Sequence, residues 1–231
     1  MTTRVGLQPR GVGMLTSSPS PDYRTLIAAA SLVVGPLLMA GGDLLHPEER
    51  MAPAEQIVIL MGQPSQWYTA HLLLFVGMML FLPGLLALAA LTGAHNPAAG
   101  YTARILMLVG VSAIASVFVG EMLVGRFVLD GADHAAATGL LQSMFSGPML
   151  AAVGPAMLAF FLGTVVFAIP LMRAGGGLGW AAALILIGVL LIFAEILSAR
   201  VMLSQIGNVL VWCGSATVAW LIVRGAAGVT E

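Results

Sequence analysis

The sequence contains no lysine, because all nine of its basic residues are arginine. This absence excludes a Walker-type phosphate loop, a Schiff-base enzyme and a Ser-Lys catalytic pair, since each of them needs a lysine amine. Cysteine is almost as scarce. Cys213 is the single cysteine, so the chain has no internal disulfide, no CxxC redox pair, no cysteine-rich zinc site and no c-type haem motif.

Charge of either sign is also rare. Charged residues make up 8% of the 231 residues, whereas hydrophobic residues make up 59%, and soluble domains carry roughly 25% charged residues. The arginines are too few and too dispersed for the basic patch that nucleic-acid binding requires. This composition predicts a protein whose main partner is the lipid bilayer and which has no nucleic-acid partner.

Six apolar segments are long enough to cross a hydrocarbon core, which needs about 20 helical residues. None shows the strict alternation of barrel strands, and backbone groups in lipid must be hydrogen-bonded within their own segment. We therefore predict an all-α, polytopic transmembrane helix bundle over residues 25–225. The six spans lie at about 25–45, 67–92, 101–128, 148–172, 178–198 and 204–224. Four prolines inside them predict kinks rather than breaks: Pro36, Pro83, Pro155 and Pro170.

The two ends of the chain differ from this apolar centre. Residues 1–24 are rich in Gly, Ser, Thr and Pro and predict a disordered tail, and residues 226–231 predict a second, short tail. A cleaved signal peptide is the alternative for the first segment, because Met39-Ala40-Gly41 resembles a cleavage site. The long polar stretch before the segment and its apolar continuation past these residues favour a membrane span.

The arginines predict the orientation of the spans, because positive residues accumulate on the cytoplasmic side of a membrane. With the amino terminus inside, the sequence places more arginines inside than outside. The inner set is Arg4, Arg10, Arg24, Arg104, Arg173 and Arg224, and the outer set is Arg50, Arg126 and Arg200. We therefore predict that both termini and both tails are cytoplasmic.

Two acidic residues lie inside the apolar segments, and each is followed by arginine five residues later: Glu121 by Arg126, and Glu195 by Arg200. A charged side chain within a span costs a few kcal/mol, so it is usually retained for a partner, a ligand or a proton. A separation of five residues does not place an acid and its own arginine on one helix face. We expect either the cross-helix pairs Glu121–Arg200 and Glu195–Arg126, or both acids facing His71 across a small cavity.

The helical rise places the ionisable groups in one layer. Counted from the cytoplasmic edges of their segments at about 1.5 Å per residue, Glu121 and Glu195 lie roughly 24–26 Å across, just below the outer surface. His71 follows an interfacial aromatic pair by one turn and shares this depth, and Asp43 and His46 end the first segment at the same rim. The sequence therefore predicts a polar site near the outer leaflet.

Three of the predicted spans end outside in a related pattern. Asp43, Glu121 and Glu195 each follow Gly or Ala and precede two apolar residues that include Leu. This pattern indicates three related hairpins, and parallel repeats of that kind occur among small transporters. Such hairpins would arrange the three acids around a pseudo-threefold axis.

Metal binding is a further possibility for this site. The candidate ligands are His71, His46, Asp43, Glu121 and Glu195, because membrane-embedded hydrolases use such mixtures of histidine and carboxylate. The local ligand spacing is missing, however, since the chain has no HExxH and no Glu-x-x-His. We therefore predict no metal and no other cofactor.

Three functions are compatible with this site. The favoured one is binding or translocation of a small or lipidic ligand, with Glu121 and Glu195 as proton or cation acceptors and Arg126 and Arg200 as anion contacts. The second is a membrane-embedded hydrolase or transferase, with or without a metal, that uses His71 and the acids. The third is a structural or regulatory subunit, in which buried ion pairs set helix packing. An oligomer or a membrane partner stays open.

Two stretches of the chain resemble a family of membrane proteins. Ala70-His71-Leu72-Leu73-Leu74 leads through Pro83-Gly84-Leu85-Leu86-Ala87-Leu88, and Gly207-Asn208-Val209-Leu210 closes toward Trp220-Leu221. These runs resemble uncharacterised six-span inner-membrane proteins of high-GC actinobacteria, and the resemblance covers most of residues 25–225. It implies a multi-pass protein of the bacterial inner (plasma) membrane and carries over no activity.

Overall fold

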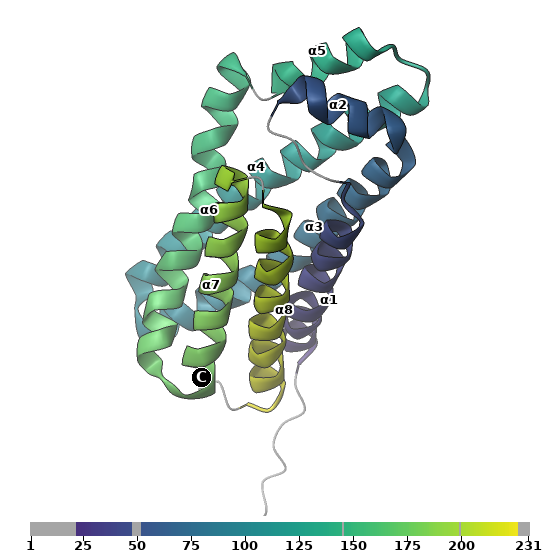
Figure 1. Ribbon diagram of the computed structural model, residues 1–231. Helices are drawn as coiled ribbons and strands as arrows, with labels where there is room; N and C mark the ends of the chain where they lie inside the picture. Colours follow the sequence, from purple (N-terminus) through teal and green to yellow (C-terminus); the bar gives the residue numbers. More distant parts are fainter. Residues whose placement is uncertain (1–21, 48–51, 145, 199, 226–231) are drawn as a thin grey trace, which may run out of the picture.

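The computed structural model describes residues 22–47, 52–144, 146–198 and 200–225, and within these ranges the chain is all-α with eight helices and no strands. Six helices are long and apolar enough to cross a membrane, as in a multi-pass membrane protein. They are α1 (Tyr23–Leu45), α3 (Pro64–His95), α4 (Pro97–Leu129), α6 (Gly147–Ala174), α7 (Gly176–Ser198) and α8 (Val201–Val223) (Figure 1). Six long apolar helices therefore lie where the six spans were predicted, each within a few residues of its predicted bounds.

Some of the sequence predictions concern residues that lie outside these ranges. They are the tail up to residue 21, the tail at 226–231, and the arginines Arg4, Arg10 and Arg50 that entered the orientation argument.

The described chain begins at Asp22, whose carboxylate accepts a hydrogen bond from the Thr25 backbone N–H at 2.8 Å and so caps α1. The first span therefore starts slightly earlier than predicted.

Local sequence explains where several helices begin and end. Asn96 separates α3 from α4, and its side chain accepts a hydrogen bond from the Ala99 backbone N–H at 3.1 Å. Pro97 follows as the first residue of α4, where its missing N–H costs nothing. Gly175 ends α6 with a φ of 78°, a conformation that favours glycine. The helices run through all four of the internal prolines, as predicted: Pro36, Pro83, Pro155 and Pro170.

The six long helices form a closed ring. In the order α1, α3, α4, α6, α7, α8, each helix packs against the next, and α8 packs against α1. Helices α1, α4 and α7 therefore occupy alternate positions around the ring. These are the helices that carry Asp43, Glu121 and Glu195, which is the arrangement that three related hairpins would have.

Glycine allows neighbouring helices to pack at very short range. A Cβ atom at Gly42 of α1 would lie 2.8 Å from the carbonyl oxygen of Ala70 on α3. A Cβ atom at Gly188 of α7 would lie 2.5 Å from the carbonyl oxygen of Gly207 on α8. Because real Cβ atoms do not approach oxygen this closely, these two interfaces require glycine, as small-residue interfaces between membrane helices often do.

Two short helices, α2 (Pro53–Gly62) and α5 (His134–Met144), were not predicted. They have 10 and 11 residues, too few to cross a membrane, and their apolar residues pack together above α3 and α4. This apolar cluster consists of Ile57, Leu60, Trp67, Val124, Ala137 and Leu141. The described termini lie at one end of the bundle, and α2 and α5 cover the opposite end (Figure 1).

The interior of the ring differs between its two ends. Toward the termini it is filled by fully buried side chains such as Leu88, Met107, Phe167 and Leu171. Thr92 of α3 joins this region to α6 by donating its hydroxyl to the Phe167 carbonyl oxygen at 3.2 Å. Toward α2 and α5 the interior is hollow, and the polar residues gather there.

Candidate functional site

A cavity of about 420 Å³ lies at the end of the ring that α2 and α5 cover. All six long helices contribute to its lining, and α2 and α5 add Gln56 and Leu141. Because every element of the bundle takes part, the cavity is a property of the closed ring and not of any one helix pair.

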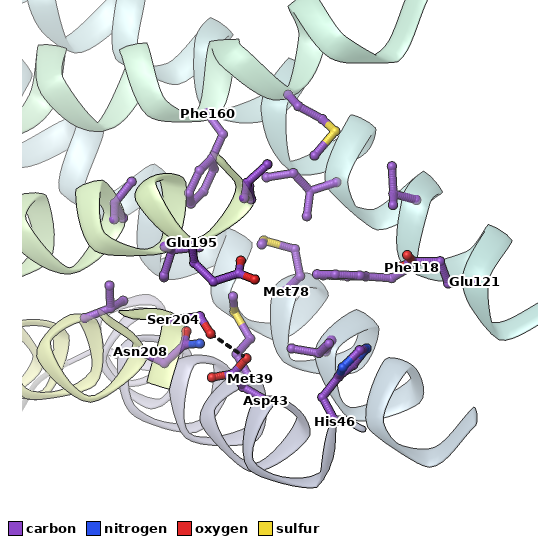
Figure 2. A pocket seen from close by; sticks show the side chains of 18 of the residues that line it. Met39, Asp43, His46, Met78, Phe118, Glu121, Phe160, Glu195, Ser204 and Asn208 are labelled. Carbon is purple, nitrogen blue, oxygen red and sulfur yellow. Dashed lines mark hydrogen bonds between the residues drawn. The ribbon is translucent and has the colours of Figure 1, made fainter. Parts of the chain in front are cut away.

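The lining has a polar part and an apolar part. The polar part contains Asp43, Glu121 and Glu195, which reach the cavity from α1, α4 and α7 (Figure 2). The apolar part is formed by aliphatic, methionine and aromatic side chains, including Met78, Phe81, Met157, Phe160, Phe161 and Val189. The site can therefore hold a polar group and an apolar group side by side.

At the polar part Glu121 contacts His71, and His71 in turn contacts His46. Its Oε2 atom lies 2.9 Å from Nε2 of His71, which is 2% exposed. The same Nε2 atom lies 3.3 Å from Nε2 of His46, whose side chain also lines the cavity. Three helix ends, from α1, α3 and α4, thus bring one carboxylate and two imidazoles into contact, although their residues lie far apart in the sequence.

Trp67 holds this group in place. Its indole N–H donates to the Glu121 carbonyl oxygen at 2.9 Å, which links α3 to α4. Gly125, one turn after Glu121, makes room for the indole, because a Cβ there would lie 2.9 Å from Trp67 Cδ1. The indole ring also covers His71, with 4.5 Å between ring centroids and 33° between ring planes. The orientation of the His71 ring is therefore set by packing as well as by hydrogen bonds.

His46 lies just beyond the last residue of α1. Its Nδ1 atom lies 2.7 Å from the Pro47 carbonyl oxygen. Burial lowers the pKa of His46, and the neighbouring His71 lowers it further. Neutral imidazole is therefore favoured at His46 relative to an exposed histidine.

The other two carboxylates lie on the α1, α7 and α8 side of the cavity. The Ser204 hydroxyl donates to Asp43 Oδ1 at 3.1 Å, and Asn208 lies one turn further along α8 beside the same carboxylate (Figure 2). Glu195 is 6% exposed and lines the same side of the cavity from α7. Asp43 and Glu195 are therefore brought to the same cavity as Glu121, in the layer that the helical rise predicts.

Three uncharged polar residues of the site were missed by the sequence analysis. Gln56, Ser204 and Asn208 are 6%, 6% and 5% exposed, and all three line the cavity. The spacing of Ser204 and Asn208, four residues apart in an apolar segment, places both on one face of α8 and could have identified them. Gln56 has no comparable signal, because it lies on the unpredicted helix α2.

The two arginines lie outside the site. Arg126 is 61% exposed and forms a two-point ion pair with Asp130, the C-cap residue of α4, at 2.7 and 3.0 Å. Arg200 is exposed at the start of α8, and no arginine is among the described residues that line the cavity. The cross-helix pairs Glu121–Arg200 and Glu195–Arg126 are absent from the described structure. Arg126 is five residues from Glu121 on α4 and so lies on another face of that helix, whereas Arg200 lies beyond the end of α7, at the start of α8.

No metal centre is found among the described residues of the site. Among the described residues, no three His, Cys, Asp or Glu side chains are grouped closely enough to hold a metal ion. His46, His71 and Glu121 meet through a single nitrogen of His71, and Asp43 and Glu195 lie on the other side of the cavity. The metal-dependent alternative therefore receives no support from this arrangement.

No protein-family model, no curated protein and no solved structure matches this chain. The resemblance to actinobacterial inner-membrane proteins stays a prediction. The chemistry of the cavity is therefore the basis on which a function is assigned.

Proposed function

We propose that this is a multi-pass protein of the bacterial inner (plasma) membrane that binds or translocates a small or lipidic ligand in the cavity between its six long helices. One observation carries the proposal. A single cavity of about 420 Å³ joins a polar part with three carboxylates to an apolar part of aliphatic and aromatic side chains. Ligand pockets typically measure about 300–1,000 Å³ and have this mixed lining.

The lining favours one chemical class of ligand. Asp43, Glu121 and Glu195 supply hydrogen-bond acceptors, and the described lining contains no arginine. A polar group that donates hydrogen bonds or carries positive charge is complementary to such a surface, whereas an anionic group is repelled. The apolar part accepts an alkyl or aromatic tail. The preferred ligand is therefore amphipathic, with a donor-rich headgroup.

The orientation is a further part of the proposal. Four exposed arginines, Arg24, Arg104, Arg173 and Arg224, belong to helix ends on the side of the described termini. Arg126 and Arg200 belong to the opposite side. The positive-inside rule then favours cytoplasmic termini, and it puts the cavity, α2 and α5 on the side of the outer leaflet.

A cavity-filling substitution tests ligand binding. The probe is an alkylamine with a fluorophore at its apolar end, titrated against the full chain in lipid nanodiscs. Met157 lines the cavity from α6, so Met157→Trp is expected to fill the apolar part and to weaken probe binding at least about tenfold, a loss of about 1.4 kcal/mol. Met172, on the same helix, is 41% exposed and does not line the cavity, so Met172→Trp is the matched control.

Two results would contradict the proposal. One is equal weakening by Met157→Trp and Met172→Trp, which would indicate a general effect on the helix or on the bilayer. The other is equal affinity for the amine and for a fatty acid with the same fluorescent tail, because the carboxylates of the cavity should discriminate against the acid. The alternatives of a hydrolase or transferase and of a structural or regulatory subunit have no specific observation in their favour.

A further inference from the structure

The two histidines of the site each present Nδ1 to a backbone carbonyl oxygen. His71 Nδ1 lies 2.9 Å from the Trp67 oxygen, and His46 Nδ1 lies 2.7 Å from the Pro47 oxygen. A carbonyl oxygen only accepts hydrogen bonds, so each of these contacts requires a hydrogen on Nδ1. The backbone thereby selects the Nδ1–H tautomer of both rings, and a neutral ring then has a bare lone pair on Nε2.

Three hydrogen-bond acceptors consequently meet at one place. They are Nε2 of His46, Nε2 of His71 and Oε2 of Glu121, with separations of 3.3 and 2.9 Å. If both rings were neutral and the carboxylate ionised, lone pairs would face one another at hydrogen-bonding distance. One added proton between His71 Nε2 and Glu121 Oε2 converts the shorter contact into a charge-assisted hydrogen bond.

The surroundings favour retention of that proton. The indole face of Trp67 lies against His71 and stabilises a positive imidazolium ring. The other titratable groups that face the pair, among the described residues, are Asp43 and His46 from the α1 end and Glu195 from α7. The residues that α2, α5, α6 and α8 present to the cavity are uncharged, such as Gln56 and Asn208. Wherever Asp43 and Glu195 are ionised, they add negative potential, which favours retention of the proton on the pair.

The position of Glu121 allows the proton of the pair to exchange with the cavity. His71 is 2% exposed, whereas Glu121 is 15% exposed and lines the cavity. A proton on the pair therefore leaves or enters through the carboxylate side. A cationic group that docks against Glu121 competes with the proton for the same carboxylate, because both cannot neutralise it at once.

We propose that His71 and Glu121 bind a single proton between Nε2 and Oε2, and that a cationic headgroup in the cavity displaces it. The second clause rests on the proposed function, while the first stands without any ligand. By linkage, displacement of one proton weakens ligand binding as the pH falls, by up to tenfold per pH unit in the range where the pair holds its proton.

The proton is tested first on the full chain in nanodiscs without a ligand. Nitrogen NMR of labelled histidine reports whether His71 Nε2 carries hydrogen, and infrared spectroscopy reports whether the Glu121 carboxyl is protonated. We expect one proton on the pair at neutral pH, lost in a single step on alkalinisation. In Glu121→Gln the side-chain amide donates a hydrogen bond to His71 Nε2 without an added proton, so His71 is expected to be neutral at the same pH. Asp130→Asn, which removes an exposed carboxylate just beyond the end of the same helix, should leave His71 unchanged.

The proposal is overturned when the wild type at neutral pH has no hydrogen on His71 Nε2 and an ionised Glu121 carboxylate. This measurement needs only the wild type, so it decides the question even if Glu121→Gln does not fold. The displacement is tested by titrating the fluorescent alkylamine at several pH values. A pH-dependent affinity in the wild type that is flat in Glu121→Gln supports it, and equal slopes refute it. A confirmed proton without any amine binding would refute the proposed function alone.

Discussion

Glu121 and Glu195 are each followed by leucine two residues later and by arginine five residues later, yet the two carboxylates have different surroundings. Glu121 binds the imidazole of His71 at 2.9 Å and is 15% exposed. Glu195 is 6% exposed and lies on the side of the cavity where Asp43 meets Ser204. The repeated sequence therefore identifies two residues of one cavity, and the neighbouring helices decide the chemistry of each.

A pH dependence of stability is expected from His46. Burial lowers its pKa, so the unfolded chain, with a histidine pKa of about 6.5, binds more protons than the folded chain during acidification. The contribution of His46 is complete above that pH and is lost as the pH falls toward the lowered pKa, by at most about 1.4 kcal/mol per pH unit. The melting temperature measured between about pH 5 and 7.5 should therefore fall on acidification, and less steeply in His46→Gln.

His95 supplies the control for this experiment, because its side chain is exposed at the end of α3. His95→Gln should melt with the same pH dependence as the wild type. Parallel curves for the wild type and His46→Gln would show that burial of His46 does not affect the folding equilibrium.

The sequence predicted the ionisable residues of the site better than the uncharged ones. A carboxylate or histidine inside an apolar segment is conspicuous because its burial is costly. Ser204 and Asn208 cost less and are common in membrane helices, so their presence alone predicts nothing. The exposed ion pair of Arg126 with Asp130 was also missed. Asp130 lies beyond the predicted end of the third span at 128, so the helical spacing of four residues was not applied to it.

At the scale of elements, adjacent glycines in α1 have opposite roles. Gly42 faces α3 so closely that a Cβ would lie 2.8 Å from the Ala70 oxygen and 2.9 Å from Leu74 Cγ. A Cβ at Gly41 would meet no atom within 4 Å. Composition alone cannot distinguish the two, because only the direction of the helix face decides which glycine is at the interface.

These two glycines form a matched pair for a stability test. Gly42→Ala is expected to push α1 away from α3 and to destabilise the fold by about 1–3 kcal/mol. Gly41→Ala should be neutral or slightly stabilising, because alanine favours helix more than glycine does. Thermal unfolding of both variants in the same detergent measures the difference. Equal melting temperatures would contradict the close α1–α3 contact.

The short helices α2 and α5 show what hydropathy misses at this scale. Each helix is too short to be predicted as a membrane span. Each buries its apolar face against the other and against Trp67 and Val124. Their helical structure is therefore a tertiary effect. They matter for the site, because Gln56 and Leu141 complete the lining of the cavity.

At the scale of the whole molecule, closure of the ring between α8 and α1 is the decisive feature. An open row of six antiparallel helices would leave Asp43 and Glu121 on separate interfaces. In the closed ring, α1, α4 and α7 alternate and direct their acids to one cavity. The charged residues then face protein and a polar interior instead of lipid, where their cost would be greatest.

The orientation of the molecule is testable by labelling with a membrane-impermeant thiol reagent in intact bacteria. Cys213→Ala provides a cysteine-free background. Ala135→Cys introduces an exposed thiol on α5, and Ala98→Cys introduces one near the α3–α4 turn at the other end. We expect the α5 thiol to react in intact cells and the other thiol to react only after permeabilisation. The reverse pattern would place both termini outside.

Sequence alone determined the class of fold, the six long apolar helices and the level of the acids along these helices, because hydrophobic length and helical rise are local properties that one segment carries by itself. Tertiary structure alone decided the closed ring, the two covering helices, and the contacts of Glu121 with His71 and of Asp43 with Ser204. It also turned Arg126 and Arg200 away from the cavity. Which helix faces meet depends on packing between segments far apart in the chain, and no local pattern specifies it.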